Sequence, residues 1–149
     1  MSKKQKQLVI CPYCGNPAEL SPGNEIYFGR KETEDRWFWE CVPCGAHVGA
    51  HANSPSHKPM GGLAKPELRT ARAEAHRVFD PLWLETSMSR TAAYRWLADE
   101  LGIGRHNCHI GYFNLEWCER TISMERKIRA MIRRRRKEAK QPRNEGTTK

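Results

Sequence analysis

Short stretches of alternating apolar and polar residues in the first third of the chain predict β-strands. Residues 8–10 and 18–20 flank the first pair of cysteines, and residues 25–28 and 37–39 lead toward the second pair. Alternation with a period of two places Trp37 and Trp39 on one face of the last strand and Phe38 on the other. The pattern indicates a small antiparallel sheet whose aromatic side chains form its core or stack on nucleic-acid bases.

From residue 66 onward the apolar positions recur at helical spacing. Leu68, Ala71 and Ala75 share one face, which predicts an amphipathic helix. Pro66 is well suited to the first position of that helix, because its missing N–H has no partner there anyway. Pro81 ends the helix, since the residue before a proline avoids the α region.

Two further helices are expected. Ser87 or Ser89 can cap a helix over residues 91–101, and Gly102 stops it. Asn114 caps the last and longest helix. The pattern therefore predicts about three helices, the last long and basic.

The apolar stripe of the last helix changes face near residue 124. Cys118 and Ile122 lie on a face that continues as Arg126, whereas Ile128 and Ile132 lie on another face. A helix buried in one body keeps one apolar side throughout. The sequence thus predicts a helix that packs on the body up to about Ile122 and projects beyond it.

The net charge of +9 is concentrated in this last segment. Residues 126–149 hold 11 of the 26 lysines and arginines but only Glu138 and Glu145 of the 17 acidic residues. The rest of the 149-residue chain therefore carries equal numbers of each sign. This distribution indicates a neutral body with a basic tail.

The six cysteines include two C-x-x-C-G motifs that favour a metal site. Cys11 and Cys14 form the first motif, and Cys41 and Cys44 form the second. Each motif turns two thiolates toward one point, and four sulfurs suit tetrahedral Zn²⁺. Disulfides are the alternative, but no signal peptide precedes the first motif, and no apolar run approaches the length of a membrane span. We therefore expect a cytoplasmic protein with one structural zinc ion and no membrane contact.

Other residues could in principle bind metal. His47 and His51 follow the second motif, and a second group contains His106, Cys108, His109 and Cys118. Four cysteines already complete a zinc site, and the spacing of the second group fits no common ligand pattern. Buried core or loop positions are the preferred interpretation for all of them.

Several features together resemble a zinc-finger-containing family of unknown function that is encoded by bacteriophages and prophages. They are the two C-x-x-C-G motifs, the aromatic strand before the second, the run Cys-Gly-Ala-His-Val-Gly-Ala-His at residues 44–51 and the helix start Leu-Ala-Lys-Pro-Glu-Leu-Arg at residues 63–69. The resemblance extends from about residue 8 into the last helix. It implies zinc and a phage or bacterial setting, and it supplies no activity and no catalytic residue that could be transferred to this chain.

The predicted fold class is α+β, with an N-terminal four-cysteine zinc ribbon followed by helices. The expected organisation is disorder at residues 1–7, a zinc ribbon at 8–52, a linker at 53–65, a helical part packed on the ribbon at 66–125, a projecting basic helix at 126–140 and disorder at 141–149.

The first functional hypothesis is an accessory protein that binds nucleic acid, and DNA before RNA. Its phosphate-binding residues would be Arg126, Lys127, Arg129, Arg133, Arg134, Arg135, Arg136 and Lys137. A solvated tail is the plainest alternative for this segment. A basic helix lying on a membrane is disfavoured, because its apolar face is short and lacks Trp and Phe.

The second hypothesis is a phage effector that binds a host protein of the transcription or defence machinery. Its partner surface would be Trp37 and Trp39 on the ribbon, or the apolar strip Ile128, Met131 and Ile132, which could also form a homodimer through the last helix. An enzyme is not expected, because there are no paired carboxylates, no nucleophile beside a base, and no open position on the zinc.

Overall fold

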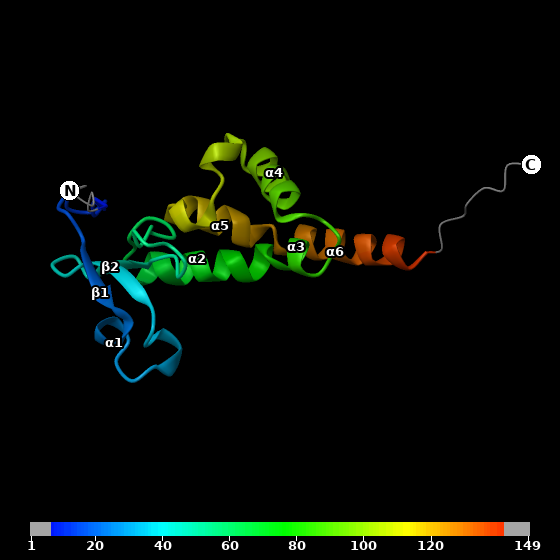
Figure 1. Cartoon of the computed structure of the whole chain (residues 1–149). Helices are drawn as coiled ribbons and strands as arrows, with labels where there is room; N and C mark the ends of the chain where they lie inside the picture. Colours follow the sequence, from blue (N-terminus) through cyan, green and yellow to red (C-terminus); the bar gives the residue numbers. More distant parts are fainter. Residues whose placement is uncertain (1–6, 142–149) are drawn as a thin grey trace, which may run out of the picture. The chain divides into compact units, whose positions relative to one another are not determined.

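The computed structural model describes residues 7–141, which form two compact units. One unit extends to Thr70 and the other begins at Ala71. The termini predicted to be disordered lie, except for Gln7 and Gln141, outside the described residues. The prediction that the helical part packs on the ribbon stays a prediction. The fold class is confirmed: a three-stranded antiparallel sheet near the N-terminus is followed by helices (Figure 1).

The sheet has the order β1-β2-β3, with β1 at Glu19–Pro22, β2 at Trp37–Cys41 and β3 at Ala46–Gly49. Its register places Leu20 and Val48 on either side of Trp39. Trp39 is buried in a small core that also contains Cys11, Cys41 and Leu63. The hydrophobic core of the ribbon therefore lies directly beside the cysteines.

Two predicted strands are corrected. Residues 8–10 contribute only an isolated bridge between Ile10 and Pro17. Residues 25–28 are no strand: α1 occupies Gly23–Ile26, and a 3-10 helix, η1, follows at Lys31–Thr33. The alternating pattern of residues 25–28 does not mark a strand with a buried face, because Phe28 is 96% exposed. Gly23 is required at the turn, since a Cβ on it would lie 1.8 Å from the carbonyl oxygen of Thr33.

The predicted linker at residues 53–65 is wrong at its C-terminal end. Leu63 and Ala64 are both buried, and Leu63 belongs to the ribbon core. Ala64 and His47 exchange two backbone hydrogen bonds of 3.1 Å. A ribbon of this size has little apolar surface to bury, so the chain returns to add Leu63 to its core.

Three helices begin the second part of the chain. α2 spans Pro66–Phe79, α3 spans Pro81–Leu84 and α4 spans Arg90–Leu101. α3 is a short additional turn that the pattern did not predict as a separate helix. The Ser89 hydroxyl accepts a hydrogen bond from the Ala92 N–H, and Gly102 ends α4 with φ of 70°. Both ends of α4 are therefore set by the residues that the sequence indicated.

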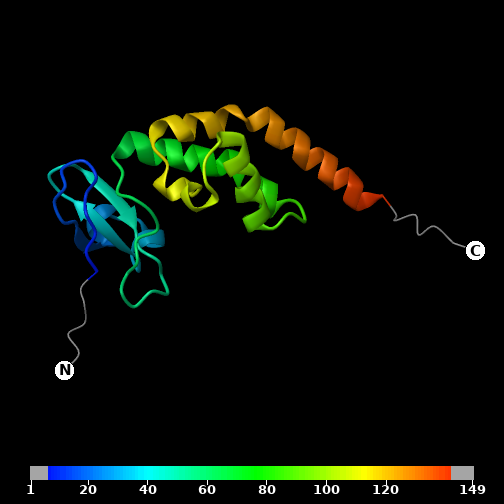
Figure 2. The ribbon, with the colours of Figure 1, turned by 90° about the horizontal axis from the view of Figure 1, so that it is seen from above.

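The last helix is two helices rather than one. Two 3-10 turns, η2 (Arg105–Asn107) and η3 (Ile110–Tyr112), precede α5 at Leu115–Ser123, and α6 follows at Glu125–Lys140. The Asn114 side chain caps α5 as predicted. Figure 2 shows the change of direction between α5 and α6, which falls at Met124.

The break allows the apolar faces of both helices to be buried. Cys118 and Ile128 are both completely buried, although ten residues of a continuous helix would place them about 80° apart. Hydroxyl hydrogen bonds from Thr121 to the Trp117 carbonyl and from Ser123 to the Arg120 carbonyl precede the break. Such back-bonding bends helices.

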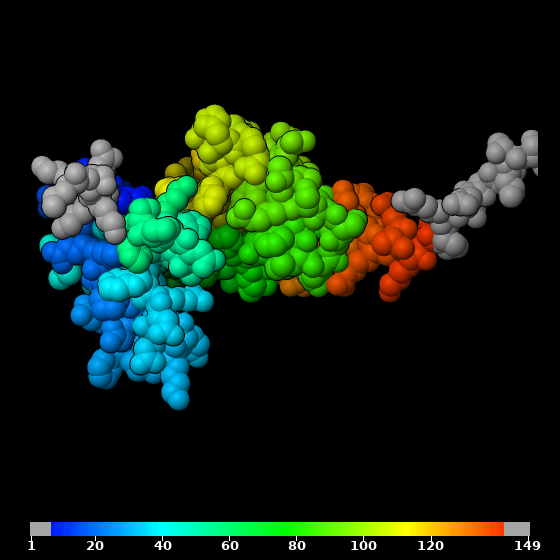
Figure 3. All heavy atoms as spheres, viewed as in Figure 1, coloured from blue at the N-terminus to red at the C-terminus, as the bar shows by residue number. Residues whose placement is uncertain are grey.

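The predicted projection from residue 126 is corrected in part. α6 packs against α3 and α5, and Ile128 and Ile132 are buried there. The end of α6 extends beyond α3 and α4 (Figure 3), although Arg136 still bonds Glu85 at the end of α3. Within residues 7–141, no helix combines the length and the apolar character that crossing a membrane requires.

Candidate metal centre and basic surface

Each C-x-x-C-G motif folds into a knuckle that turns two sulfurs inward. The Gly15 N–H donates to the Cys11 carbonyl at 2.9 Å, and the Gly45 N–H donates to the Cys41 carbonyl at 3.0 Å. Both glycines have positive φ, at 76° and 65°. That backbone conformation is costly for residues with a Cβ, which explains why glycine follows each pair.

The four sulfurs of Cys11, Cys14, Cys41 and Cys44 converge on one point. All four lie within 4.8 Å of one another, and the sulfurs of Cys14 and Cys41 are 3.6 Å apart. A tetrahedral zinc site with bonds of about 2.3 Å requires sulfur separations of about 3.8 Å. The cluster therefore fits a single zinc ion, and the predicted cofactor is confirmed.

The crowded thiols differ in how readily they ionise. The backbone N–H of Asn16 lowers the pKa of Cys14 to about 7. Hydrogen bonding to Cys14 and burial raise the pKa of Cys44 to about 12. One thiolate thus forms readily while its neighbour retains its proton. A bound dication would favour the thiolate form of all four cysteines, because a coordinating thiol is deprotonated outright.

No histidine belongs to the cluster, which is the one group of three or more metal-ligating side chains within residues 7–141. The Nε2 atom of His47 lies 3.1 Å from the Tyr27 hydroxyl. His51 and His106 are exposed, and His109 stacks on Tyr94. The two remaining cysteines, Cys108 and Cys118, are buried in the helical unit, and burial raises the pKa of both thiols.

The stability of the ribbon is expected to depend on His47 below neutral pH. Burial, with a contribution from Arg69, lowers the pKa of His47 from 6.5 to about 4. Between these values the unfolded chain binds the proton more readily than the folded chain. The stabilisation is therefore complete above pH 6.5 and is lost as the pH falls toward 4, by up to about 3 kcal/mol.

Denaturant unfolding of zinc-loaded wild type and His47→Phe across this pH range would measure the effect. Loss of zinc from protonated thiolates affects both proteins, so the difference between them isolates the histidine. Identical pH dependence in the two proteins would contradict the prediction.

The basic residues predicted to bind nucleic acid fall into two groups on α6. Three of them have carboxylate partners: Lys127 pairs with Glu100 at 2.7 Å, Arg129 with Glu125 at 2.7 Å and Arg136 with Glu85 at 3.0 Å. The other five form no side-chain hydrogen bond or ion pair with any residue that the structure describes; they are Arg126, Arg133, Arg134, Arg135 and Lys137.

The predicted partner surfaces are mostly closed. Trp39 is only 7% exposed, and its indole N–H donates to the His57 carbonyl at 2.7 Å. Ile128 and Ile132 are core residues, and Met131 is half-buried. The apolar strip is thus the inner face of α6. Trp37 alone of these residues keeps a large exposed fraction, 42%.

The sequence did not single out Arg77, which resembles an ordinary exposed residue of α2. Only the fold brings its guanidinium to Glu125 of α6, where the Nη1 to Oε1 distance is 3.3 Å. No local spacing could have shown this contact, because the two residues are 48 positions apart.

The two knuckles and the three-stranded sheet define a zinc-ribbon type of metal-binding protein. Comparison with known families matches residues 7–128 to DUF3268, a zinc-finger-containing domain, and the chain belongs to that family. Searches of the curated proteins and of the solved structures gave no match.

Proposed function

We propose that the chain is a zinc-ribbon accessory protein of bacteriophage type that binds nucleic acid, with DNA as the first candidate, through the basic surface of α6. The observation that carries the proposal is the set of five basic side chains on this helix that have no ion-pair partner among residues 7–141. Lysine and arginine that are not neutralised within the protein are available to phosphates, and they release counterions when they bind them.

The anchoring of α6 supports this function. Ile128 and Ile132 anchor the first turns of the helix by its apolar side, so the basic residues belong to a helix whose start is fixed. Less conformational entropy is then lost on binding than for a flexible tail. The exposed ion pairs of Lys127, Arg129 and Arg136 are individually weak, so phosphates can compete for these side chains as well.

The zinc ion has a structural role in this proposal, and the protein is not an enzyme. Four cysteine sulfurs complete a tetrahedral site and leave no position for a water or a substrate. A cytoplasmic location and a homodimer through α6 stay predictions.

Neutralising the free basic residues is expected to weaken nucleic-acid binding. Arg126, Arg134 and Lys137 are exposed and can be replaced by glutamine without disturbing an ion pair within residues 7–141. Fluorescence anisotropy with a labelled DNA duplex would measure affinity across a salt series. We expect the slope of log affinity against log salt to fall by about 0.9 for each lost phosphate contact.

A control variant removes the same charge from the ribbon. Lys31, Arg36 and Lys58 are exposed, and their replacement by glutamine leaves α6 unchanged. If this control weakens binding as much as the α6 variant, the surface is assigned to the wrong part of the chain. If wild-type protein binds neither DNA nor RNA at low salt, the proposed function fails.

Binding of a host protein is the second candidate, and one observation favours it. Trp37 and Met60, which is 50% exposed, line a hollow of about 230 Å³ on the ribbon together with His57. Exposed aromatic and methionine side chains are typical of protein interfaces. A stoichiometric complex from bacterial lysate that survives nuclease treatment and is lost on Trp37→Ala would support this candidate over nucleic acid.

A further inference from the structure

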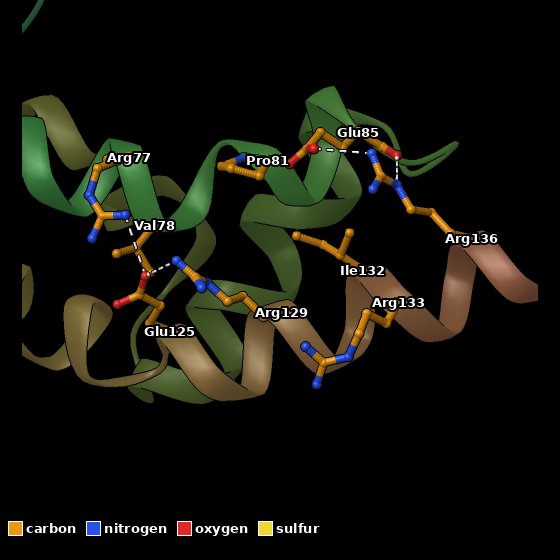
Figure 4. Close-up of a pocket in the computed structure, with 9 residues that line it drawn as sticks. All are labelled: Arg77, Val78, Pro81, Glu85, Glu125, Arg129, Ile132, Arg133 and Arg136. Carbon is orange, nitrogen blue, oxygen red and sulfur yellow. Dashed lines mark hydrogen bonds and ion pairs between the residues drawn. The ribbon is translucent and has the colours of Figure 1, made fainter.

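The helical unit contains a groove rich in arginine. α2, α3 and α6 surround it, and its cavity volume is about 310 Å³ (Figure 4). Four of its lining residues are arginines and two are glutamates. The complete lining is Arg77, Val78, Pro81, Glu85, Glu125, Arg129, Ile132, Arg133 and Arg136.

One carboxylate in the groove already shows how an oxyanion is held there. The Oε1 atom of Glu125 accepts hydrogen bonds from Arg77 at 3.3 Å and from Arg129 at 2.7 Å. The two guanidinium groups come from different helices and meet on a single oxygen. Planar guanidinium groups arranged in this way suit carboxylate and phosphate oxygens alike.

Arg133 gives the groove an uncompensated positive charge. It lies one helical turn beyond Arg129, and Figure 4 shows it between the Glu125 pair and the Arg136 pair. No side-chain hydrogen bond or ion pair joins it to another residue in the described part of the chain. Arg77 also pairs with Glu74, which lies outside the lining, so the four arginines exceed the three carboxylates around them by one charge. A phosphate monoester, with about −1.5 to −2 at neutral pH, covers that excess.

The apolar floor strengthens the attraction. Val78, Pro81 and Ile132 line the groove beside the charged groups, and Ile132 is 8% exposed. Charges beside apolar groups are less screened than charges surrounded by water. An anion in this groove therefore gains more than an anion on the open surface of α6.

The positions of the two glutamates favour the end of a nucleic-acid strand as the ligand over an internal stretch of its backbone. Glu125 and Glu85 lie toward opposite ends of the groove (Figure 4). A continuous backbone passing through would bring phosphates close to both carboxylates, and like charges that are brought together are costly. A terminal phosphate concentrates its negative charge at one point, and the nucleic-acid chain continues from it in one direction only.

We infer that the groove binds the terminal phosphate monoester of a nucleic-acid strand, with Arg77, Arg129 and Arg133 as donors. This inference rests on the proposed function, because it assigns one part of the bound nucleic acid to one site. It adds a preference for phosphorylated ends to the general attraction of α6 for the backbone.

The test compares oligonucleotides that differ only in one terminal phosphate. The zinc-loaded full-length protein would be titrated with strands ending in a 5′-phosphate, a 3′-phosphate or hydroxyl groups. We expect at least one phosphorylated end to bind about tenfold more tightly than the hydroxyl end, as charge-assisted hydrogen bonds allow. Arg133→Gln should bring the ratio of the affinities for the phosphorylated and the hydroxyl end close to one.

Arg134→Gln is the matched control. Arg134 neighbours Arg133 on the same helix and carries the same charge, but it does not line the groove. The control should weaken all strands equally and keep the ratio. Because neither arginine forms an ion pair with a residue that the structure describes, both variants are expected to fold.

Three results would overturn the inference. Equal affinity of the wild type for phosphorylated and hydroxyl ends would remove it and leave the proposed function intact. If the affinity ratio falls equally in Arg133→Gln and Arg134→Gln, the preference arises from the overall positive charge of α6 and not from the groove. A free nucleoside monophosphate that competes as well as the phosphorylated strand would show that the strand is not the source of the ligand. Absence of binding to every strand would instead refute the proposed function itself.

Discussion

Cys11→Ser is expected to abolish zinc binding and to unfold the ribbon. Cys11 is completely buried and belongs both to the zinc cluster and to the hydrophobic core of the ribbon. Structural zinc contributes on the order of 10 kcal/mol of apparent folding free energy in small domains. The core beside it contains only a few buried side chains, so the remaining contacts cannot replace that contribution.

Native mass spectrometry would count the zinc ions, and amide NMR spectra would report on the fold of residues 7–70. Wild type should hold one ion per chain, and Cys11→Ser should hold none and lose the dispersed signals of the sheet. Cys118→Ala is the control, because it also removes a buried thiol but leaves the cluster complete. A folded sheet in metal-free Cys11→Ser protein would refute the structural role of zinc.

Ile128→Ala is expected to destabilise the helical unit by about 3 kcal/mol. The Ile128 side chain is completely buried where α6 packs on its neighbours. Truncating a buried isoleucine to alanine removes its burial and leaves a cavity, which costs about 2–5 kcal/mol. Urea unfolding monitored on the helical unit would measure the change.

Met131→Ala serves as the control on the same helix. Met131 is only half-buried, so its truncation should cost clearly less than that of Ile128. If both substitutions have the same small effect, Ile128 is not a core residue. The apolar strip would then be free to bind a partner, as the sequence pattern first suggested.

The zinc site could be predicted from the sequence because its geometry is local. Each C-x-x-C-G motif closes its own knuckle through a backbone hydrogen bond onto a glycine with positive φ. Two such motifs need only a short sheet between them to bring four sulfurs together. The caps at Ser89 and Asn114 were predictable for the same reason, since each side chain bonds a backbone N–H three residues away.

The role of the region between the ribbon and α2 could not be predicted in this way. Its glycine, proline and serine content correctly indicates turns, which are local. The burial of Leu63 depends instead on how little other apolar surface the ribbon core contains. That quantity belongs to the whole unit and not to any window of residues.

The last segment shows the same division. The change of apolar face near Met124 is visible in the sequence, and the helix breaks there. The pattern could not show that Ile128 and Ile132 face a core, because an apolar stripe facing solvent and one facing α3 look identical. The pairing of Arg77 with Glu125 depends on the same packing.

The sequence by itself therefore determined the zinc ligands, the α+β class, the capped helix ends and the concentration of positive charge near the C-terminus. The tertiary structure decided which apolar residues are core, which basic residues are neutralised within the chain and which remain free on α6. The physical reason is range: knuckles and caps form between residues a few positions apart. Burial and ion pairing depend on elements that meet only after the chain has folded.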